Sequence, residues 1–316
     1  MKILLFISIV IIGVFFINAY FINNREIEYL NQEKIAATTT TTTTLSTKSI
    51  TINVSSNDVE QGGTLTVKIN NATTSEGIIG KFDDKTFDWI KTENPGEYLG
   101  IIGIDVRKTP GDYSLIVSLN GEEKLNRKIA VRKGDFYVTK FVLTPELEKQ
   151  GYTQANIVEK IQTTDGVLIG NVIGKYTSQS YFANPFVYPL DSIVKVGDFG
   201  VTRKTGDISL RHLGVDLDAK LNTPIYAIND GVVEFRQELT TYGKTIIIDH
   251  GFGIYSLYLH LNEFKVELGD KVKRGEIIGL SGTTGYSLEP HLHFSIKANG
   301  ASVDPLNFIK VANSGF

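Results

Sequence analysis

The sequence predicts a mainly β protein in which two β-rich domains are joined by a short helical connector and preceded by a membrane anchor. Short runs rich in Val, Ile, Thr and aromatic residues alternate with Gly, Asn and Asp turn signals over residues 49–133 and again over residues 190–312. Two short helical patterns lie in residues 134–189 between them. The length of 316 residues suits about two domains.

Composition excludes several classes of function. The formal charge of −3 gives no basic field, so nucleic acid is not an expected partner. The absence of cysteine excludes disulfides, thiol nucleophiles and cysteine-ligated zinc. Histidine and carboxylate side chains are therefore the available metal ligands, and the sequence leaves the oligomeric state open.

The first 24 residues predict a transmembrane signal-anchor. After Lys2, the stretch "ILLFISIVIIGVFFINAYFI" is free of charge and, as a helix, long enough to span a hydrocarbon core of about 30 Å. A cleavable signal peptide with "INA" before Tyr20 is the alternative, and either one exports the rest of the chain. Residues 25–48 contain a threonine run from Thr38 and are expected to be a Thr-rich linker.

Residues 49–133 predict an immunoglobulin-like β-sandwich, because about seven short strands are separated by turn signals such as Asn-Pro-Gly and Asn-Gly. Trp89 is interpreted as a core residue. In the helical and extended connector, residues 134–189, Thr144 is a predicted N-cap with Pro145 at the first helical position. "TQANIVEKIQ" predicts a second short helix, and "SYFANPFVYPL" is expected to be extended.

All histidines of the chain lie in the last third, which hints that they gather in space; they are His212, His250, His260, His291 and His293. In "RHLGVDLD", alternation predicts a strand with His212, Gly214 and Asp216 on one face, the glycine leaving room for an ion or for close backbone approach. In "HLHF", His291 and His293 would point to one side while Leu292 and Phe294 turn to the core.

"KTIIIDHGFGIYSLYLHL" predicts a hairpin with "DHGFG" as its turn. Alternation would place Ser256, Tyr258 and His260 on one face of its second strand. His250 at the turn fits a hydrogen-bonding role at least as well as a substrate role. The glycine-rich "VELGDKVKRGEIIGLSGTTG" suggests a lipoyl or biotinyl carrier, but no Met-Lys-Met or Asp-Lys-Ala signal presents a modifiable lysine.

From about Val196 to Phe308 the chain resembles the lysostaphin-type, LytM-like zinc metallopeptidases, a family of peptidoglycan endopeptidases. The resemblance lies in "HLGVDLDA", "YGKTIIIDHGFGIYSLYLHL", "VELGDKVKRGEIIGLSGTTGYS", "PHLHFSIKANG" and "VDP", which occur in the family's order. Asn222 and "SLEPHLHF" depart from the common pattern, which concerns substrate preference more than metal binding. The resemblance implies an antiparallel β metallopeptidase domain over residues 190–312.

The resemblance also implies roles for five side chains. His212, Asp216 and His293 would hold one Zn²⁺ per chain, and His260 and His291 would be the catalytic imidazoles. Three protein ligands leave a fourth zinc position for water, as catalytic sites require. No His-Glu-x-x-His helix exists in this chain, so a histidine would replace the carboxylate base of that class.

The expected function is a zinc metalloendopeptidase that hydrolyses peptide bonds in peptidoglycan stem or cross-bridge peptides. The alternative is a noncatalytic member that binds wall or activates an amidase. The expected location is the bacterial cell envelope, with the folded domains outside the cytoplasm on a single-pass anchor, or secreted if the N-terminus is cleaved. The connector helices or the aromatic stretch "SYFANPFVYPL" could cover the catalytic groove.

Overall fold

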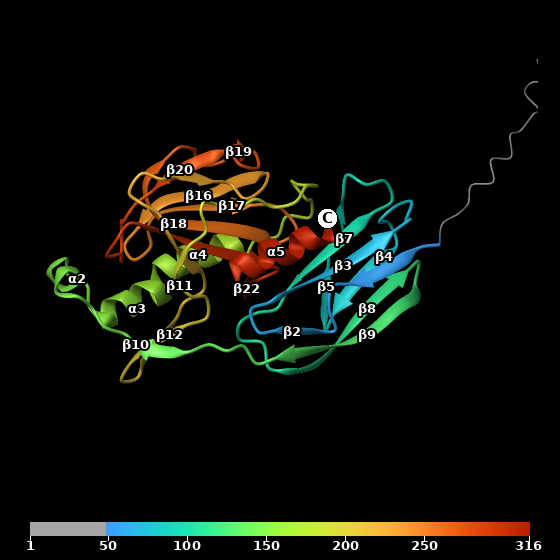
Figure 1. Ribbon diagram of the computed structural model, residues 1–316, viewed down its shortest axis with the longest axis horizontal. Helices are drawn as coiled ribbons and strands as arrows, with labels where there is room; N and C mark the ends of the chain where they lie inside the picture. Colours follow the sequence, from blue (N-terminus) through green and yellow to red (C-terminus); the bar gives the residue numbers. More distant parts are fainter. Residues whose placement is uncertain (1–48) are drawn as a thin grey trace, which may run out of the picture. The chain divides into compact units, whose positions relative to one another are not determined.

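The computed structural model describes residues 49–316, in which four β-sheets are accompanied by short helices (Figure 1). Within these residues, no helix is long and apolar enough to cross a membrane. The predicted anchor and the Thr-rich linker lie outside the described residues.

Two sheets that share one apolar core make up residues 51–132. The first has the order β1 (Thr51–Val54), β3 (Thr64–Asn70), β7 (Tyr98–Gly103) and β6 (Ile90–Lys91). The second has the order β2 (Asp58–Glu60), β9 (Glu122–Arg132), β8 (Gly111–Leu119), β4 (Ile78–Phe82) and β5 (Lys85–Phe87). Val67 of the first sheet and Val117 of the second belong to the same buried cluster, as alternating apolar strands require. Trp89 packs on Phe87 in this core, as predicted.

The connector contains three helices and one strand. β10 (Val138–Lys140) pairs in parallel with β12 (Thr202–Thr205), which pairs with β13 (Ile208–Arg211). The predicted helix that follows the N-cap Thr144 is α2 (Pro145–Lys149). The second predicted helix is α3 (Gln154–Thr163), which is capped by Thr153. The sequence reading missed α4 (Asp165–Ile173), whose glycines weaken the helical pattern. Its buried Asp165 carboxylate accepts a hydrogen bond from Thr241 N.

A ten-stranded antiparallel sheet forms the C-terminal domain. Its main order is β11 (Lys195–Gly197), β14 (Val215–Asp218), β21 (His291–Ala298), β18 (Ile254–Phe264), β17 (Gly243–Asp249), β16 (Gly231–Leu239) and β19 (Lys271–Val272). The remaining strands are β15 (Pro224–Tyr226), β20 (Ile277–Ser281) and β22 (Ala301–Val303). Leu292 and Phe294 are fully buried, so β21 turns its other face, with both histidines, outward as predicted.

Helix α5 (Pro305–Gly315) is the last element of the described residues and contacts both β21 and β3. The Asp304 side chain caps it by accepting from Leu306 N and Asn307 N. Leu99 and Ile101 of β7 belong to the same buried cluster as Phe308 of α5 and Ala298 of β21. The two β-rich domains therefore share an apolar contact rather than a free linker.

Candidate functional site

Two imidazole nitrogens and one carboxylate oxygen meet where β14 pairs with β21. Asp216 lies opposite His293 in the strand register, and Asp216 Oδ1 is 2.9 Å from His293 Nδ1. His212 Nε2 is 3.0 Å from Asp216 Oδ1 and 3.0 Å from His293 Nδ1. Within residues 49–316, this is the one group of three such side chains that could share a metal ion. The prediction that His212 belongs to the strand is wrong, because β14 begins at Val215.

The second nitrogen of each imidazole has its own partner. His212 Nδ1–H donates to the carbonyl oxygen of Asp198 at 2.7 Å, which leaves a lone pair on Nε2. The Ser295 hydroxyl lies 2.9 Å from His293 Nε2, where it can accept that nitrogen's proton and leave Nδ1 free to ligate. Two imidazole lone pairs and one carboxylate oxygen facing one point are a donor set that suits zinc. The residues present therefore fit the metal that the sequence predicted.

Gly214 permits this close approach of strands. A Cβ atom at this position would lie 2.3 Å from Ser295 Oγ and 2.6 Å from His293 Nε2. The glycine in "RHLGVDLD" is therefore needed for backbone approach, as the sequence indicated.

His260 reaches the site through a β-bulge. Its φ of +62° lies in the left-handed region, and the register between β17 and β18 shifts beside it. The predicted common face with Ser256 and Tyr258 is therefore wrong: those two side chains are fully buried, whereas His260 lines the cavity that holds the ligand cluster. Its Nδ1–H donates to the carbonyl oxygen of Thr284 at 2.8 Å.

His291 lies beside His260, with 4.9 Å between the ring centroids. Its Nδ1–H donates to the carbonyl oxygen of Glu289 at 2.8 Å, so that Nε2 faces the cluster at 3.7 Å from Asp216 Oδ1. The structure thus brings together all five residues that the sequence singled out, as three potential ligands and two further imidazoles.

Burial and neighbouring charges set the protonation of the cluster. Burial lowers the pKa of His260 to about 3, with the nearby His291 and His293 acting in the same direction. Burial likewise lowers the pKa of His293 to about 4. Burial alone would raise the pKa of the Asp216 carboxyl, but hydrogen bonds with His212 and His293 outweigh it and hold this pKa below its usual range. Neutral imidazoles beside an ionised carboxylate are the state that a cation binds.

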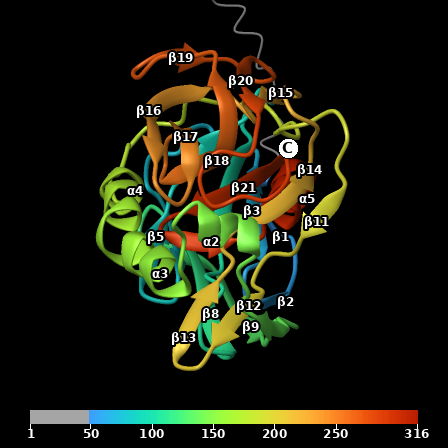
Figure 2. The ribbon, with the colours of Figure 1, turned by 90° about the vertical axis from the view of Figure 1, so that its left-hand side faces the viewer.

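The cluster opens into a cavity of about 730 Å³. Ile169 and Ile173 of α4 line it, and this helix packs on the sheet beside β16, as Figure 2 shows. The connector helices therefore form a wall of the groove, and none of their side chains joins the ligand group. The aromatic stretch lies elsewhere: Phe182 and Phe186 are buried against Phe316.

The fifth histidine, His250, lies outside this cavity and has no exposed surface. Its Nδ1–H donates to the carbonyl oxygen of Asp230 at 2.8 Å, and its Nε2 is 2.8 Å from the Ser256 hydroxyl. That hydroxyl is 3.0 Å from the hydroxyl of Tyr258. His250 therefore has the hydrogen-bonding role that the sequence left as one alternative.

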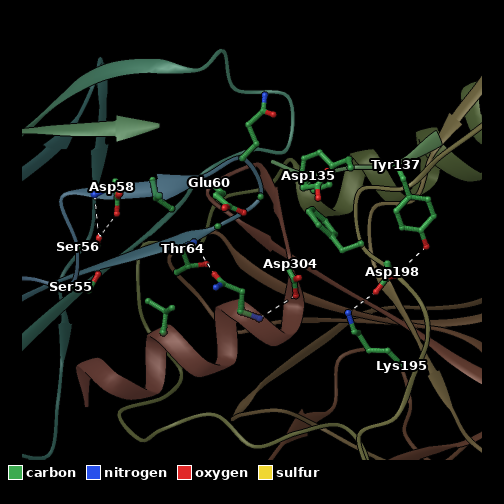
Figure 3. A pocket seen from close by; sticks show the side chains of 18 residues that line it. Ser55, Ser56, Asp58, Glu60, Thr64, Asp135, Tyr137, Lys195, Asp198 and Asp304 are labelled. Carbon is green, nitrogen blue, oxygen red and sulfur yellow. Dashed lines mark hydrogen bonds and ion pairs between the residues drawn. The ribbon is translucent and has the colours of Figure 1, made fainter. Parts of the chain in front are cut away.

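Sequence reasoning missed the residues that support His212. Figure 3 shows Asp198 between Tyr137 and Lys195, at the rim of a second cavity of about 550 Å³. The Tyr137 hydroxyl donates to Asp198 Oδ2 at 3.1 Å, and Lys195 Nζ lies 2.5 Å from Asp198 Oδ1. These contacts hold the loop whose carbonyl oxygen orients His212. No local sequence signal marks them: Lys195 and Asp198 are three residues apart, but Tyr137 lies 61 residues before Asp198 in the chain.

Comparison with known proteins places this domain in a family. Residues 210–305 match Peptidase family M23. The chain is 43% identical over 110 residues to the glycyl-glycine endopeptidase ALE-1 of Staphylococcus capitis, which covers 33% of this chain and 30% of that protein. It is 30% identical over 200 residues to an uncharacterized metalloprotease of Buchnera aphidicola, which covers 58% of this chain and 52% of that protein.

A crystal structure from Pseudomonas aeruginosa, described as a peptidase M23, matches this chain with a TM-score of 0.55 and 21% sequence identity. The match covers 79% of this chain and 93% of that chain. At this identity the likeness concerns the fold alone. The chain spans 22% to 52% of the length of the curated relatives it matches.

Residues 210–305 therefore form a Peptidase M23 domain. It belongs to peptidase family M23, the lysostaphin-type and LytM-like family, as the sequence motifs predicted. Membership implies a bound metal, for which the His–Asp–His group is the available site within residues 49–316.

Proposed function

We propose that this protein is a zinc-dependent endopeptidase that cuts peptide bonds in peptidoglycan. The observation that carries the proposal is the convergence of five side chains: a compact His212–Asp216–His293 ligand group, and two further imidazoles that line the same cavity. A noncatalytic wall-binding or amidase-activating role would need neither His260 nor His291 in this position. The peptidoglycan substrate is supported by the similarity to the peptidoglycan DD-endopeptidase ShyA of Vibrio cholerae.

Zinc at this site would supply a Lewis acid and lower the pKa of a coordinated water from about 15.7 towards 7. The residues of the chain would do the rest. His260 and His291 each use Nδ1 to donate to a backbone carbonyl, so each keeps Nε2 for the substrate. One imidazole would accept a proton at Nε2 from the attacking water, and the other, protonated on both nitrogens, would donate a hydrogen bond from Nε2 to the developing oxyanion. The groove wall formed by α4 would orient the peptide and exclude solvent.

We further propose the arrangement along the chain that the sequence predicted. The first 24 residues would anchor the protein in the membrane of a bacterial envelope, and residues 25–48 would tether the folded unit. The two packed sheets of residues 49–133 would be an immunoglobulin-like module held close to the wall. A tether of this length reaches roughly 25 to 30 Å, so the substrate would be wall near the membrane.

The test uses the purified full-length chain, loaded with zinc and incubated with peptidoglycan, followed by mass spectrometry of released fragments. We expect new peptide termini from the native protein and none from His291→Ala that binds zinc one to one. Termini produced equally by both proteins would remove His291 from the mechanism. If the native zinc-loaded protein releases no new termini from peptidoglycan with or without glycine cross-bridges, the endopeptidase function is contradicted.

A further inference from the structure

The face of β21 that carries the two histidines continues beyond them. His291, His293, Ser295 and Lys297 alternate along the strand, and all four line the same cavity. With a rise of about 3.4 Å per residue, Lys297 lies roughly 14 Å along the strand from His293. A peptide in this groove would therefore meet an ammonium group some three to four residues from the ligand cluster.

Lys297 is a buried cation without an anionic partner. The residue is 9% exposed, and its Nζ makes one hydrogen bond, to the Ser302 hydroxyl of β22. It forms no salt bridge with any carboxylate of residues 49–316. Asp105, the carboxylate whose charge acts on Lys297, is already engaged by the Arg107 side chain and by Ser302 N. Burying a charge without a counter-charge is costly, so an unpaired lysine in a groove indicates a ligand.

The charge of Lys297 persists at neutral pH. Burial lowers the pKa of its ammonium to about 8, and Arg107 acts in the same direction against the opposing effect of Asp105. The group is therefore mostly protonated near pH 7, and an anion placed beside it would relieve its desolvation.

A second cation lies at the same end of the groove. Arg211 lines the cavity and donates to the carbonyl oxygen of Val106 at 3.3 Å. Val106 N in turn donates to Ser302 O, and Ser302 is the register partner of Lys297. Arg211 also forms no salt bridge within the described part of the chain.

The acidic residues of the cavity lie at its other end. Apart from the ligand Asp216, they are Asp218, which is opposite His291 in the register, and Glu289, two residues before it. Two further cations, Lys140 and Arg203, also line the cavity, while Lys297 and Arg211 are the cations beyond the metal ligands.

We propose that Lys297, assisted by Arg211, binds a free carboxylate of the substrate peptide and thereby selects acidic peptides. This inference rests on the proposed endopeptidase function and narrows its substrate class. Peptidoglycan stem peptides carry carboxylates on acidic residues and at their C-termini, whereas glycine cross-bridges carry no charge between their ends. The groove is thus built for stem-peptide substrates with unmodified carboxylates.

The test compares two preparations of one probe: cross-linked muropeptide dimers with free carboxylates, and the same dimers amidated with carbodiimide and ammonium chloride. For the zinc-loaded full-length chain, we expect a KM at least about tenfold lower for the free-carboxylate form, with kcat changed less than twofold. Lys297→Met keeps the side-chain length and should raise this KM to the value for the amidated form. Lys297→Arg should retain the preference.

A purely structural role for Lys297 makes a different prediction. Lys297→Met would then change thermal stability or affect both probes equally, and a carboxylate preference that survives in Lys297→Met would overturn the proposal. Binding of both probes to the metal-free chain is measured by calorimetry as well. If the native enzyme cleaves neither probe, the endopeptidase function fails, while the calorimetric difference between native and Lys297→Met still decides whether Lys297 recognises carboxylate.

Discussion

The buried His250 should make the folded protein sensitive to acid. Burial lowers its pKa from 6.5 to about 4, since a proton would place a charge in the core beside Ser256 and Tyr258. The unfolded chain therefore binds the proton first as the pH falls. The stability that the neutral imidazole contributes is fully present above pH 6.5 and is lost between pH 6.5 and pH 4.

The size of this effect follows from the pKa difference. A shift from 6.5 to about 4 corresponds to about 3 kcal/mol of unfolding free energy lost between pH 7 and pH 4. The matched variant is His250→Asn, whose side-chain amide can still donate to the carbonyl oxygen of Asp230 but does not titrate. Its stability at neutral pH will differ from the native value, because it fills less space.

The assay is urea unfolding of the metal-free protein at several pH values between 7 and 4, for the native chain and the variant. All other titrating groups are common to both and cancel in the difference. We expect the native protein to lose about 3 kcal/mol more than His250→Asn over this interval. Equal pH slopes would show that His250 is not held neutral in the fold, and would refute the reasoning.

Three further predictions concern the metal site and the groove wall. Gly214→Ala should lower zinc affinity at least about tenfold, because the added Cβ would meet Ser295 and His293. The control Gly170→Ala adds its Cβ in open space and should leave zinc affinity unchanged. Competition with a chelator measures the zinc affinity of both variants. Ser295→Ala removes the hydroxyl beside His293 Nε2 and should cost about 10- to 100-fold in zinc affinity by the same assay, with thermal stability nearly unchanged. Ile169→Ala should destabilise the protein by about 2 to 4 kcal/mol in urea unfolding, because Ile169 packs α4 onto the sheet; a loss below about 0.5 kcal/mol would mean that the helix is not docked.

Local patterns predicted much of the site. The alternation in "HLHF" placed His291 and His293 on one face and the apolar residues behind them, since strand periodicity acts at short range. The same alternation extends to Ser295 and Lys297, so the sequence pattern of this strand could have placed both side chains on the face of the histidines. His260 could not be placed this way, because a bulge depends on the register between β17 and β18, which is a property of two strands.

Features that depend on distant segments were not predictable. Helix α4 is poor in helical signal because its sequence contains Gly166 and Gly170, and it is held by packing against β16 and by the Asp165 carboxylate. The pairing of β10 with β12 joins segments more than 60 residues apart, as does the contact of Tyr137 with Asp198. Tertiary contacts, not local propensity, decide such elements.

The shared apolar contact between the two β-rich domains also bears on how this protein can be altered. Leu99 and Ile101 of β7 lie in one buried cluster with Ala298 and Phe308. A shortened chain that begins after the first domain would expose this apolar patch to water and would tend to aggregate. For the same reason, exchanging the first domain for an unrelated module would require a new surface that matches α5. The two domains are thus constrained to change together, although only the second carries the metal ligands.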